Sequence, residues 1–594
     1  MVKIGQILAA AVGLAAALDN GFDRPPMGWS ALYGAPFGAV NETMVLAAAA
    51  GLKSSGLLAA GYEYVALDDW YATRDAAGKL VGRADTFPSG MPAVSAGVHG
   101  AGCKFGVYSA AGMRTCANFS ASLFNEQQDA ATLAHEWQID YLKYDACRYS
   151  AGVAGRARYE AMGRALNATG RRIFYSVEGW DPNPLTDSDW APEVANMWRT
   201  GADIWPYWDS GLPGHAILFN LYATNYAAPY GASVGATNDP DMLQPPGDGL
   251  LKSVRSPGLT SQEARSQFVL WAIMKAPLTL SVNWAQLADL PTLDPAYFAL
   301  LTHPEVIAID QDLSPQATLR AQMPSAAQQA GANASAAGSL QVTLQKCDRA
   351  RADQRFARAA GTADTIQLVG STLCLAVDAS AAGNAAVLAK PCSDTATGGW
   401  TALQRDATLS IAKSSAGSSG GGGLCLSGAG DGTLPLKPNL KPTAAKCLYD
   451  GPLPPPLDVA SDHALGEQLF VWSDFNAQIV SGGTGQCLTV GLPNYVSDMK
   501  WTNNSGTLEH EVWMGDLTAS AATGKARRVV VLFNKGAATE TVTAAPGLIG
   551  TAGAHAATAL RDVLARKDLA PLAPGAALAA SVPSHGVALF VLER

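Results

Sequence analysis

The sequence predicts an α/β protein in which a (β/α)8 TIM barrel is followed by an all-β C-terminal sandwich carrying an inserted all-β unit. Between residues 18 and 315, eight apolar, strand-like segments alternate with Ala-rich, helix-like stretches. A later region repeats one strand pattern three times, and short apolar runs separated by turns follow it. At 594 residues the chain is also too long for a single hydrophobic core.

The eight predicted barrel strands are short apolar segments. The chain between them shows helical periodicity, for example in Glu42–Ala60 and Gln262–Lys275. The predicted strands are Pro26–Ser30, Tyr64–Asp69, Lys104–Ser109, Tyr141–Asp145, Ile173–Glu178, Ala202–Trp205, Ser233–Asp239 and Leu278–Val282. The alternative, an open doubly wound sheet, is disfavoured because no glycine-rich phosphate-binding sequence follows the first strand.

Polar side chains gather at the carboxyl ends of these strands, which meet at one mouth in a barrel. They are Asp68, Asp69, Tyr108, Lys143, Asp145, Glu178, Arg199, Asp203, Asp239 and Asp241. Carboxylates, an arginine and tryptophans in one sheltered cup suit a sugar, whose hydroxyls bond to carboxylates and whose C–H face packs on aromatic rings. The expected partner is therefore a carbohydrate.

The run Asp140–Cys147 carries the most informative pair. Lys143 and Asp145 lie on the same face because side chains alternate along a strand. A neighbouring ammonium favours the ionised form of a carboxylate, which a catalytic carboxylate requires. A structural ion pair at the strand end is the alternative interpretation.

The N-terminal segment predicts export. Met1–Ala17 has a lysine near its start, a short apolar core and small residues at a cleavage site, as in a secretory signal peptide. Five Asn-x-Ser/Thr sequons fit a glycosylated protein. They begin at Asn41, Asn118, Asn167, Asn333 and Asn503. We expect a secreted, extracellular protein, or one delivered to a vacuole- or lysosome-like compartment.

Composition argues against other partner classes. A net charge of −9 gives no electrostatic reason to expect nucleic acid or an anionic membrane surface. No later run approaches the ~20 apolar residues that a membrane-spanning helix needs. The acidic residues lie on separate strand ends without the spacing of a calcium loop, so neither a metal nor an organic cofactor is implied.

Nine cysteines in an exported chain are expected to be mostly paired. Cys116 and Cys147, which flank the strand that carries Lys143, are predicted to form a disulfide. Cys103 is left over in an apolar run and is predicted to be a buried thiol. The remaining six lie in the repeated region and are Cys347, Cys374, Cys392, Cys425, Cys447 and Cys487.

The repeated region contains three versions of one strand, each with a cysteine in second position. These are Leu373–Val377, Leu424–Gly428 and Gln486–Val490. Another cysteine ends a further strand in each copy, which predicts a threefold all-β unit. Six cysteines allow 15 connectivities. The favoured pairs are Cys374–Cys392, Cys425–Cys447 and Cys347–Cys487.

This region, residues 338–492, resembles a ricin B-type β-trefoil lectin domain. The Gln-x-Trp signature of that family is replaced by near forms in Gln354–Phe356 and Gln468–Phe470. The resemblance implies a β-trefoil that anchors the protein on glycans, with Asp378 as a possible acceptor for sugar hydroxyls. A disulfide-stabilised spacer without a sugar site is the alternative.

The residues after the repeats predict a small antiparallel sandwich over 508–594. The stretch 316–337 is assigned to the same sandwich, because Ala317–Gln322 can form its first strand. The β-trefoil is then an insertion between two sandwich strands, which is tolerated where the ends of the insert lie close together.

The barrel region resembles glycoside hydrolase family 27, the α-galactosidase and α-N-acetylgalactosaminidase family. The matching motifs stand in order at Asp19–Gly21, Pro26–Trp29, Leu67–Asp69, Gly106–Ser109, Leu142–Cys147, Trp198–Asp203, Asn238–Leu243, Trp271–Leu278 and Ile307–Asp312. The resemblance implies a retaining α-galactosidase with Asp145 as nucleophile and Asp203 as acid/base. The substrate-binding residues it implies are Trp29, Asp68, Asp69, Tyr108, Cys116, Lys143, Glu178, Arg199, Asp241 and Met242.

The chemistry sets two expectations for this pair of carboxyl groups. The nucleophile must be ionised, which Lys143 favours, and the acid/base must be protonated at the start of the reaction. Burial among Trp198, Trp205 and Trp208 is expected to raise the pKa of Asp203.

Departures from the family pattern leave the sugar open. Val177–Trp180 replaces the usual Cys-Glu-Trp block that contacts the sugar's 2-position, and Glu178 favours a free 2-hydroxyl over an acetamido group. The alternatives are an α-N-acetylgalactosaminidase, an isomaltose-type α-glycosidase, or a carbohydrate-binding protein that does not cleave.

Overall fold

The computed structural model divides the chain into two compact units, residues 1–321 with 510–594, and residues 322–509. In the first unit it describes residues 20–36, 38–147, 155–178, 190–201, 203–209, 216–231, 235–248, 258–321, 510–551 and 557–594. In the second unit it describes strand residues and Glu509. The proposed signal peptide and the sequons at Asn333 and Asn503 lie outside the described residues.

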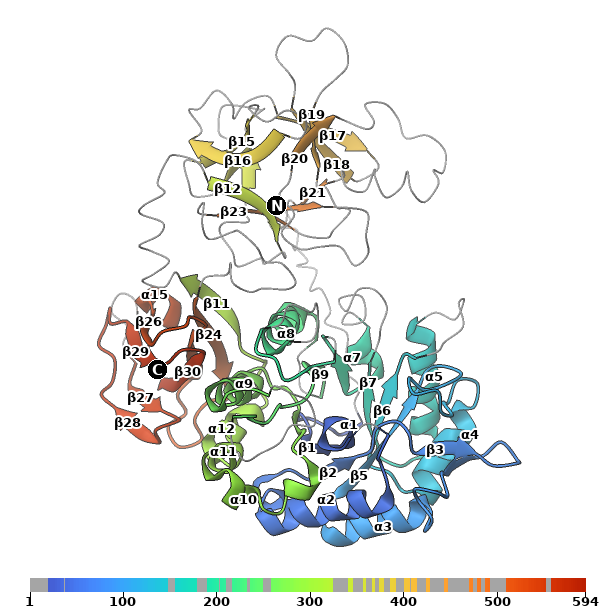
Figure 1. Ribbon diagram of the computed structural model, residues 1–594. Helices are drawn as coiled ribbons and strands as arrows, with labels where there is room; N and C mark the ends of the chain where they lie inside the picture. The colour runs from blue at the N-terminus through green and yellow to red at the C-terminus, as the bar shows by residue number, and fades with distance from the viewer. Residues whose placement is uncertain are drawn as a thin grey trace, which may run out of the picture. The chain divides into compact units, whose positions relative to one another are not determined.

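Eight parallel strands form the core of the first unit (Figure 1). They are β1 (Met27–Ser30), β2 (Tyr64–Ala66), β5 (Lys104–Ala110), β6 (Tyr141–Asp145), β7 (Phe174–Val177), β8 (Met197–Arg199), β9 (Thr237–Asp239) and β10 (Leu278–Leu280). They are hydrogen-bonded in the order β10-β1-β2-β5-β6-β7-β8-β9. A parallel bridge between Leu243 and Leu280 joins the two ends of this order and closes the barrel.

Helices connect the strands of the barrel. They are α1 (Ala31–Gly34), α2 (Glu42–Ser55), α3 (Met91–Ala101), α4 (Glu126–Ala131), α5 (Gly155–Ala168), α7 (Ala191–Val194), α8 (Ile217–Gly231), α9 (Ser261–Ile273), α10 (Leu290–Leu293), α11 (Pro295–Leu301) and α12 (Pro304–Asp310), with short turns η1 (Leu58–Ala60), η2 (Thr132–Glu136) and η3 (Trp284–Gln286). A small hairpin of β3 (Ala72–Arg74) and β4 (Leu80–Gly82) follows β2. Among the described residues, no helix has the length and apolar character to cross a membrane.

Local signals explain where the longer helices begin and end. Asn41 caps α2 by accepting the Met44 N–H, and Gly56 ends it with a left-handed φ of 91°. Thr260 and Glu263 form a capping box at the start of α9. The predicted helices Glu42–Ala60 and Gln262–Lys275 are therefore present, with α2 ending earlier than expected.

The sixth barrel strand was predicted wrongly. It is β8, which pairs Met197 with Ser176 of β7 and Arg199 with Asp239 of β9, whereas the prediction placed it at Ala202–Trp205. The apolar residues Ile204 and Trp205, which suggested a strand, lie in the loop after β8. As a result, Arg199 ends the strand and Asp203 lies in the loop after it.

The C-terminal part of the first unit is an antiparallel β structure. A six-stranded sheet has the order β11-β24-β25-β30-β27-β28, and β26 pairs with β29. The strands are β11 (Thr318–Met323), β24 (His510–Leu517), β25 (Arg527–Asn534), β26 (Glu540–Ala544), β27 (Ala559–Asp562), β28 (Lys567–Leu569), β29 (Leu578–Val582) and β30 (Gly586–Glu593), with α15 (Pro546–Ile549) after β26. β11 and β24 are neighbours in this sheet although the second unit separates them in the sequence.

The second unit is a twelve-stranded antiparallel sheet. Its strands are β12 (Leu340–Gln345), β13 (Phe356–Arg358), β14 (Ile366–Leu368), β15 (Leu373–Asp378), β16 (Ala385–Pro391), β17 (Trp400–Arg405), β18 (Thr408–Lys413), β19 (Leu424–Ser427), β20 (Thr443–Lys446), β21 (Phe470–Ser473), β22 (Gln478–Ser481) and β23 (Cys487–Gly491). The path runs β12-β23-β22-β21-β18-β19-β20-β16-β15-β14-β13, with β17 beside β18 and β12 also beside β16.

The register of the second unit repeats three times. Cys374 lies opposite Lys390, Cys425 opposite Ala445, and Cys487 opposite Gln345. In each case the other cysteine of the predicted pair comes two residues after the partner in the sequence. Side chains of this unit, apart from that of Leu375, lie outside what the structure describes, so the three disulfides remain predictions.

Candidate active site

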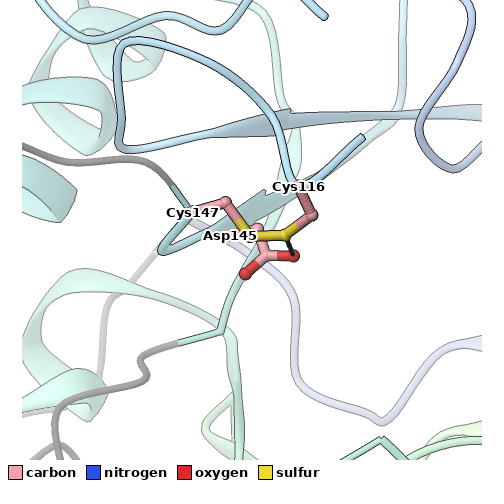
Figure 2. Close-up of side chains that lie close together, drawn as sticks. All are labelled: Cys116, Asp145 and Cys147. Carbon is pink, nitrogen blue, oxygen red and sulfur yellow. Dashed lines mark hydrogen bonds between the residues drawn. A yellow bond between two sulfur atoms is a disulfide. The ribbon is translucent and has the colours of Figure 1, made fainter. Parts of the chain in front are cut away.

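The carboxylate of Asp145 is held at the carboxyl end of β6. It is buried, and the Tyr108 hydroxyl donates a hydrogen bond of 2.8 Å to its Oδ2 while the Ala146 N–H donates one of 2.6 Å to its Oδ1. Cys116 and Cys147 are joined by a disulfide, and Cys116 Sγ lies 3.4 Å from Asp145 Oδ2 (Figure 2). Both oxygens of the predicted nucleophile therefore have fixed neighbours.

The same three side chains lie close enough together to bind a metal ion, but the disulfide prevents this. The ligand atoms of Cys116, Asp145 and Cys147 lie within 4.8 Å of one another. Sulfur binds a metal as a thiolate, and a disulfide offers none. The arrangement instead pins the loop after β5 against the loop after β6.

Lys143 lies between two carboxylates at the barrel mouth. Its Nζ is 3.0 Å from Asp68 Oδ2 and 3.2 Å from Glu178 Oε2, and it lies 5.2 Å from the centre of the Tyr108 ring. The sequence predicted that Lys143, on the same strand face, favours the ionised form of Asp145. The ion pairs of this lysine are with the two neighbouring carboxylates, so it acts on Asp145 through its charge.

Arg199 is the second cation of the site and is 4% exposed. Its guanidinium lies 2.9 Å from Glu178 Oε1, 2.5 Å from Asp203 Oδ1 and 3.0 Å from Asp241 Oδ2. Glu178 therefore bridges Arg199 and Lys143. The sequence-predicted carboxylates of four different strands and loops belong to one connected network of charges.

Backbone N–H groups fix the remaining carboxylates. Asp69 accepts hydrogen bonds from the N–H groups of Ala117 at 2.8 Å and Trp70 at 2.7 Å. Asp241, whose φ is 72°, accepts from Ile204 at 2.7 Å and Met242 at 2.8 Å. These donors were missed from the sequence because a backbone group carries no residue-specific signal.

A cavity inside the barrel joins much of the site. Trp29 is completely buried beneath it, with its indole N–H donating to the Val282 carbonyl at 2.8 Å. Of the sequence-predicted residues, the cavity wall includes Trp29, Asp68, Lys143, Arg199, Asp241 and Met242. The cavity therefore brings an aromatic ring, a methionine and charged groups around one space, and Asp145 and Asp203 are not among the residues that line it.

Two family models match the chain. The model described as alpha galactosidase A covers residues 34–312, and the alpha galactosidase C-terminal beta sandwich domain covers residues 507–592. Alpha-galactosidase 2 of Arabidopsis thaliana is 41% identical over 300 residues, which is 50% of this chain and 69% of that protein. The chain belongs to the α-galactosidase family.

Other family members agree. The alpha-galactosidase of Coffea arabica is 40% identical over 50% of this chain and 72% of that protein. Among solved structures, alpha-galactosidase I from Mortierella vinacea has a TM-score of 0.57 at 20% identity, covering 97% of this chain and 98% of that one. The alpha-galactosidase of Saccharomyces cerevisiae has a TM-score of 0.56 at 20% identity, covering 96% and 97%. At these identities the structural likeness concerns the fold.

The pKa values of the two predicted catalytic carboxyl groups in this family member differ from expectation. Burial raises the pKa of Asp145 to about 6, although Lys143, Ala146 and Tyr108 oppose the rise. Burial also acts to raise the pKa of Asp203, but Arg199 outweighs it and the pKa lies below its ordinary value. Without substrate, Asp145 therefore holds a proton more readily than Asp203.

The expected effect of three tryptophans on Asp203 was wrong. The Asp203 side chain is 39% exposed and is paired with Arg199. Trp208 stacks on His585 at a centroid distance of 5.5 Å, and Trp205 lies against Tyr207 at 6.2 Å. The tryptophans close in sequence pack on other partners, while the arginine four residues earlier determines the charge state.

Proposed function

We propose that this protein is a retaining exo-α-galactosidase that releases terminal α-linked galactose from oligosaccharides, glycoconjugates or polysaccharides. The supporting observation is the Asp145 carboxylate, fixed on both oxygens at the barrel mouth and electrostatically coupled to Asp203. Retention needs a carboxylate nucleophile and a second carboxyl group that serves as acid and then as base.

In the first step, an Asp145 oxygen attacks the anomeric carbon and forms a glycosyl ester. The bond to the leaving oxygen breaks, and that oxygen takes the proton of Asp203. In the second step, Asp203 accepts a proton from water, and the resulting oxygen displaces Asp145 from the same carbon. Galactose leaves with its original configuration, and both carboxyl groups return to their starting state.

The resting charge distribution adds one requirement. Near pH 6 the coupled pair holds its proton preferentially on Asp145, whereas the reaction needs that proton on Asp203. The proton count is already correct, and only its location must change. A bound sugar displaces water from the Arg199–Asp203 pair. Loss of this water disfavours the charged form of Asp203, so the proton moves from Asp145 to Asp203.

Recognition of the sugar is assigned to the charged groups around Trp29. Asp68 and Asp69 accept hydrogen bonds from its hydroxyls, and Trp29 forms part of the cavity wall beside Asp68. Glu178 lies between Lys143 and Arg199, where an acetamido group would separate these charges. This arrangement supports galactose over N-acetylgalactosamine.

Hydrolysis of para-nitrophenyl α-galactoside, α-N-acetylgalactosaminide and α-glucoside by the purified protein tests the proposal. We expect rapid release from the galactoside, and loss of that release in Asp145→Asn with the fold retained. Release only from another sugar would replace the specificity and keep the mechanism. An undiminished rate in Asp145→Asn would refute the assigned nucleophile. Binding of galactose without release from any substrate would favour a non-catalytic carbohydrate-binding protein.

We also propose that the second unit is a ricin B-type β-trefoil that anchors the enzyme on glycans. The threefold register around Cys374, Cys425 and Cys487 supports this interpretation. Co-sedimentation of Asp145→Asn with insoluble galactomannan, with and without free galactose, measures anchoring. We expect Asp378→Ala to weaken it; unchanged sedimentation would favour a spacer role at that site. Peptide mapping without reduction tests the three disulfide pairs.

The proposed compartment is extracellular or vacuole-like. The Cys116–Cys147 disulfide fits an oxidising route of synthesis. The sequon asparagines Asn118 and Asn167 are exposed, whereas Asn41 uses its side chain as a helix cap. Of the three sequons within the described residues, Asn118 and Asn167 should therefore carry glycans in preference to Asn41, which peptide mapping after N-glycan removal checks. Glycan-free peptides at both positions would contradict this route.

A further inference from the structure

Helix α8 contacts the barrel mouth on one side and the C-terminal sandwich on the other. Successive residues are rotated by about 100° around a helix axis, so Asn220 and Thr224 lie on one face. Tyr222, about 160° from both, lies on the opposite face. The two faces carry different polar contacts. These contacts place α8 between the proposed acid/base and a separate β structure.

The barrel-facing side of α8 holds the loops that carry two active-site carboxylates. Asn220 is fully buried, and its Nδ2 donates to the Pro240 carbonyl at 2.9 Å, next to Asp241. Its side-chain oxygen packs so closely on Gly201 that an added Cβ would lie 2.4 Å away. Glycine is therefore required two residues before Asp203.

A second contact on this face fixes the start of the same loop. The hydroxyl groups of Thr224 and Thr200 lie 2.6 Å apart. The Thr200 N–H also donates to the Asp239 carbonyl at 2.9 Å, which extends the pairing of β8 with β9 by one residue. The path from α8 to Asp203 is thus three residues long and is anchored at Thr200 and Gly201.

The sandwich-facing side of α8 ends in a buried polar cluster. The Tyr222 hydroxyl donates to Glu511 Oε1 at 2.7 Å, and Lys535 Nζ lies 2.8 Å from that hydroxyl and 2.7 Å from the same carboxylate oxygen. The Trp513 indole N–H donates to Glu511 Oε2 at 2.9 Å, and its ring stacks on Tyr222. The Asn225 side chain accepts the Leu319 N–H of β11 at 2.9 Å.

The cluster of Tyr222, Glu511 and Lys535 fixes the position of α8 on the sandwich more than it stabilises the fold. The side chains of Glu511 and Lys535 are 0% and 5% exposed. A buried ion pair gains little net stability over apolar packing, because desolvation offsets the attraction, but its hydrogen bonds fix direction and distance. Apolar contact alone would let α8 slide over the sheet.

We propose that the C-terminal sandwich positions the Asp203 carboxyl group through α8, with Tyr222 as the positioning residue on the sandwich side and Asn220 on the barrel side. This inference rests on the proposed role of Asp203 as acid/base. Proton transfer requires hydrogen-bond geometry, so a small displacement of the loop lowers the rate of steps that need an acid while leaving nucleophilic attack intact.

The test compares Tyr222→Phe with wild type on two galactosides that differ in leaving group. A dinitrophenyl group departs without a proton, whereas the sugar alcohol of melibiose or raffinose needs one. kcat/KM reports the first chemical step for both. We expect Tyr222→Phe to lower kcat/KM for raffinose about tenfold and for the dinitrophenyl galactoside by less than about twofold.

A matched control removes another polar contact across the same interface. Arg561 of β27 pairs with Glu305 of α12, not with a residue of α8, at 2.5 and 2.7 Å. Glu305→Gln should leave the ratio of the two kcat/KM values unchanged. Thr224→Val, which lacks the hydroxyl facing Thr200, should reproduce the effect of Tyr222→Phe, and it serves if that variant folds poorly.

The outcomes separate the two proposals. An active wild type in which Tyr222→Phe lowers both kcat/KM values equally, or in which Glu305→Gln gives the same selective loss, would overturn the positioning role alone. An equal loss means general destabilisation. A wild type inactive on all galactosides would overturn the proposed function and, with it, the role of Asp203 on which the inference depends.

Discussion

Replacing Tyr108 with phenylalanine removes one defined hydrogen bond from the proposed nucleophile. The hydroxyl donates to Asp145 Oδ2 over 2.8 Å, and it remains protonated because burial and then the Asp145 charge hold its pKa well above the ordinary value. A hydrogen bond to a charged group contributes about 1.5–3 kcal/mol, and one pKa unit corresponds to about 1.36 kcal/mol. The substitution should therefore raise the pKa of Asp145 from about 6 by about one to two units.

The pH dependence of kcat/KM measures this change. The reactive state holds one proton on the Asp145–Asp203 pair, so activity is present below the pKa of Asp145 and is lost as the pH rises through it and that proton leaves. The alkaline limb should move from near pH 6 in wild type to about pH 7–8 in Tyr108→Phe. A para-nitrophenyl galactoside suits the assay because product release is followed after quenching at one fixed pH.

Tyr71→Phe is the matched control for this prediction. The Tyr71 hydroxyl donates to the Tyr108 carbonyl at 2.7 Å and not to a carboxylate. Its removal should therefore leave the pH profile of kcat/KM unchanged. If Tyr108→Phe lowers kcat/KM while the alkaline limb stays near that of wild type, the reasoning is refuted. Tyr108 would then act on the sugar and not on the charge state of Asp145.

Three further predictions concern other parts of the first unit. Asp203→Ala should lower kcat/KM for raffinose about 10²–10⁴-fold, and azide should restore kcat on an activated galactoside with α-galactosyl azide as product; failure of azide to rescue would argue against the acid/base role. Reducing the Cys116–Cys147 disulfide, which spans 31 residues, should cost about 3–4 kcal/mol of unfolding free energy by the chain-entropy model and inactivate the enzyme, and an unchanged melting temperature would contradict this. Burial acts to raise the pKa of Asp312, but hydrogen bonds from Ser314 and Thr518 lower it to about 2. The ionised Asp312 therefore stabilises the fold above pH ~4, and this stabilisation is lost as the pH falls toward 2. In denaturant titrations Asp312→Asn should lose less unfolding free energy over that pH range, and an equally steep loss would exclude Asp312 as its cause.

The gathering of the candidate site residues in one place could be predicted from the sequence because these polar residues follow strands of a repeated pattern. Asp68, Lys143 and Asp145 each end or nearly end an apolar run, and in a closed barrel these ends meet at one mouth. The order of the strands needs only their parallel, right-handed connection. These residues therefore fall together whatever the details of the loops.

The environment of Asp203 could not be predicted in the same way. Its pKa depends on which neighbour lies within a few ångströms, and sequence proximity to three tryptophans does not give that information. The sixth strand ends at Arg199, which places the guanidinium 2.5 Å from Asp203 and turns Trp208 toward His585 of the sandwich. Placing that strand five residues later in the sequence therefore led to the wrong sign for the pKa shift.

The contribution of the sandwich to the site was also not visible in the sequence. Tyr222 and Glu511 are 289 residues apart, and neither lies in a family motif. A contact of this kind depends on the packing of a helix on a distant sheet. Hydrogen bonds from backbone donors such as the Ala146 N–H are also not predictable from the sequence, because every residue except proline carries an N–H group.

Because β11 and β24 are neighbours, a domain can be inserted between them in the sequence without disrupting the sheet. The chain leaves the sheet after Met323 and returns at His510, beside the point of departure. Closing a flexible loop costs only about 0.6 kcal/mol more for each doubling of its length, so the sheet tolerates inserts of very different size. A domain with adjacent termini can be exchanged here while the catalytic barrel keeps its own folding unit. A change in the inserted unit can therefore occur without a change in the strands and helices of the catalytic barrel.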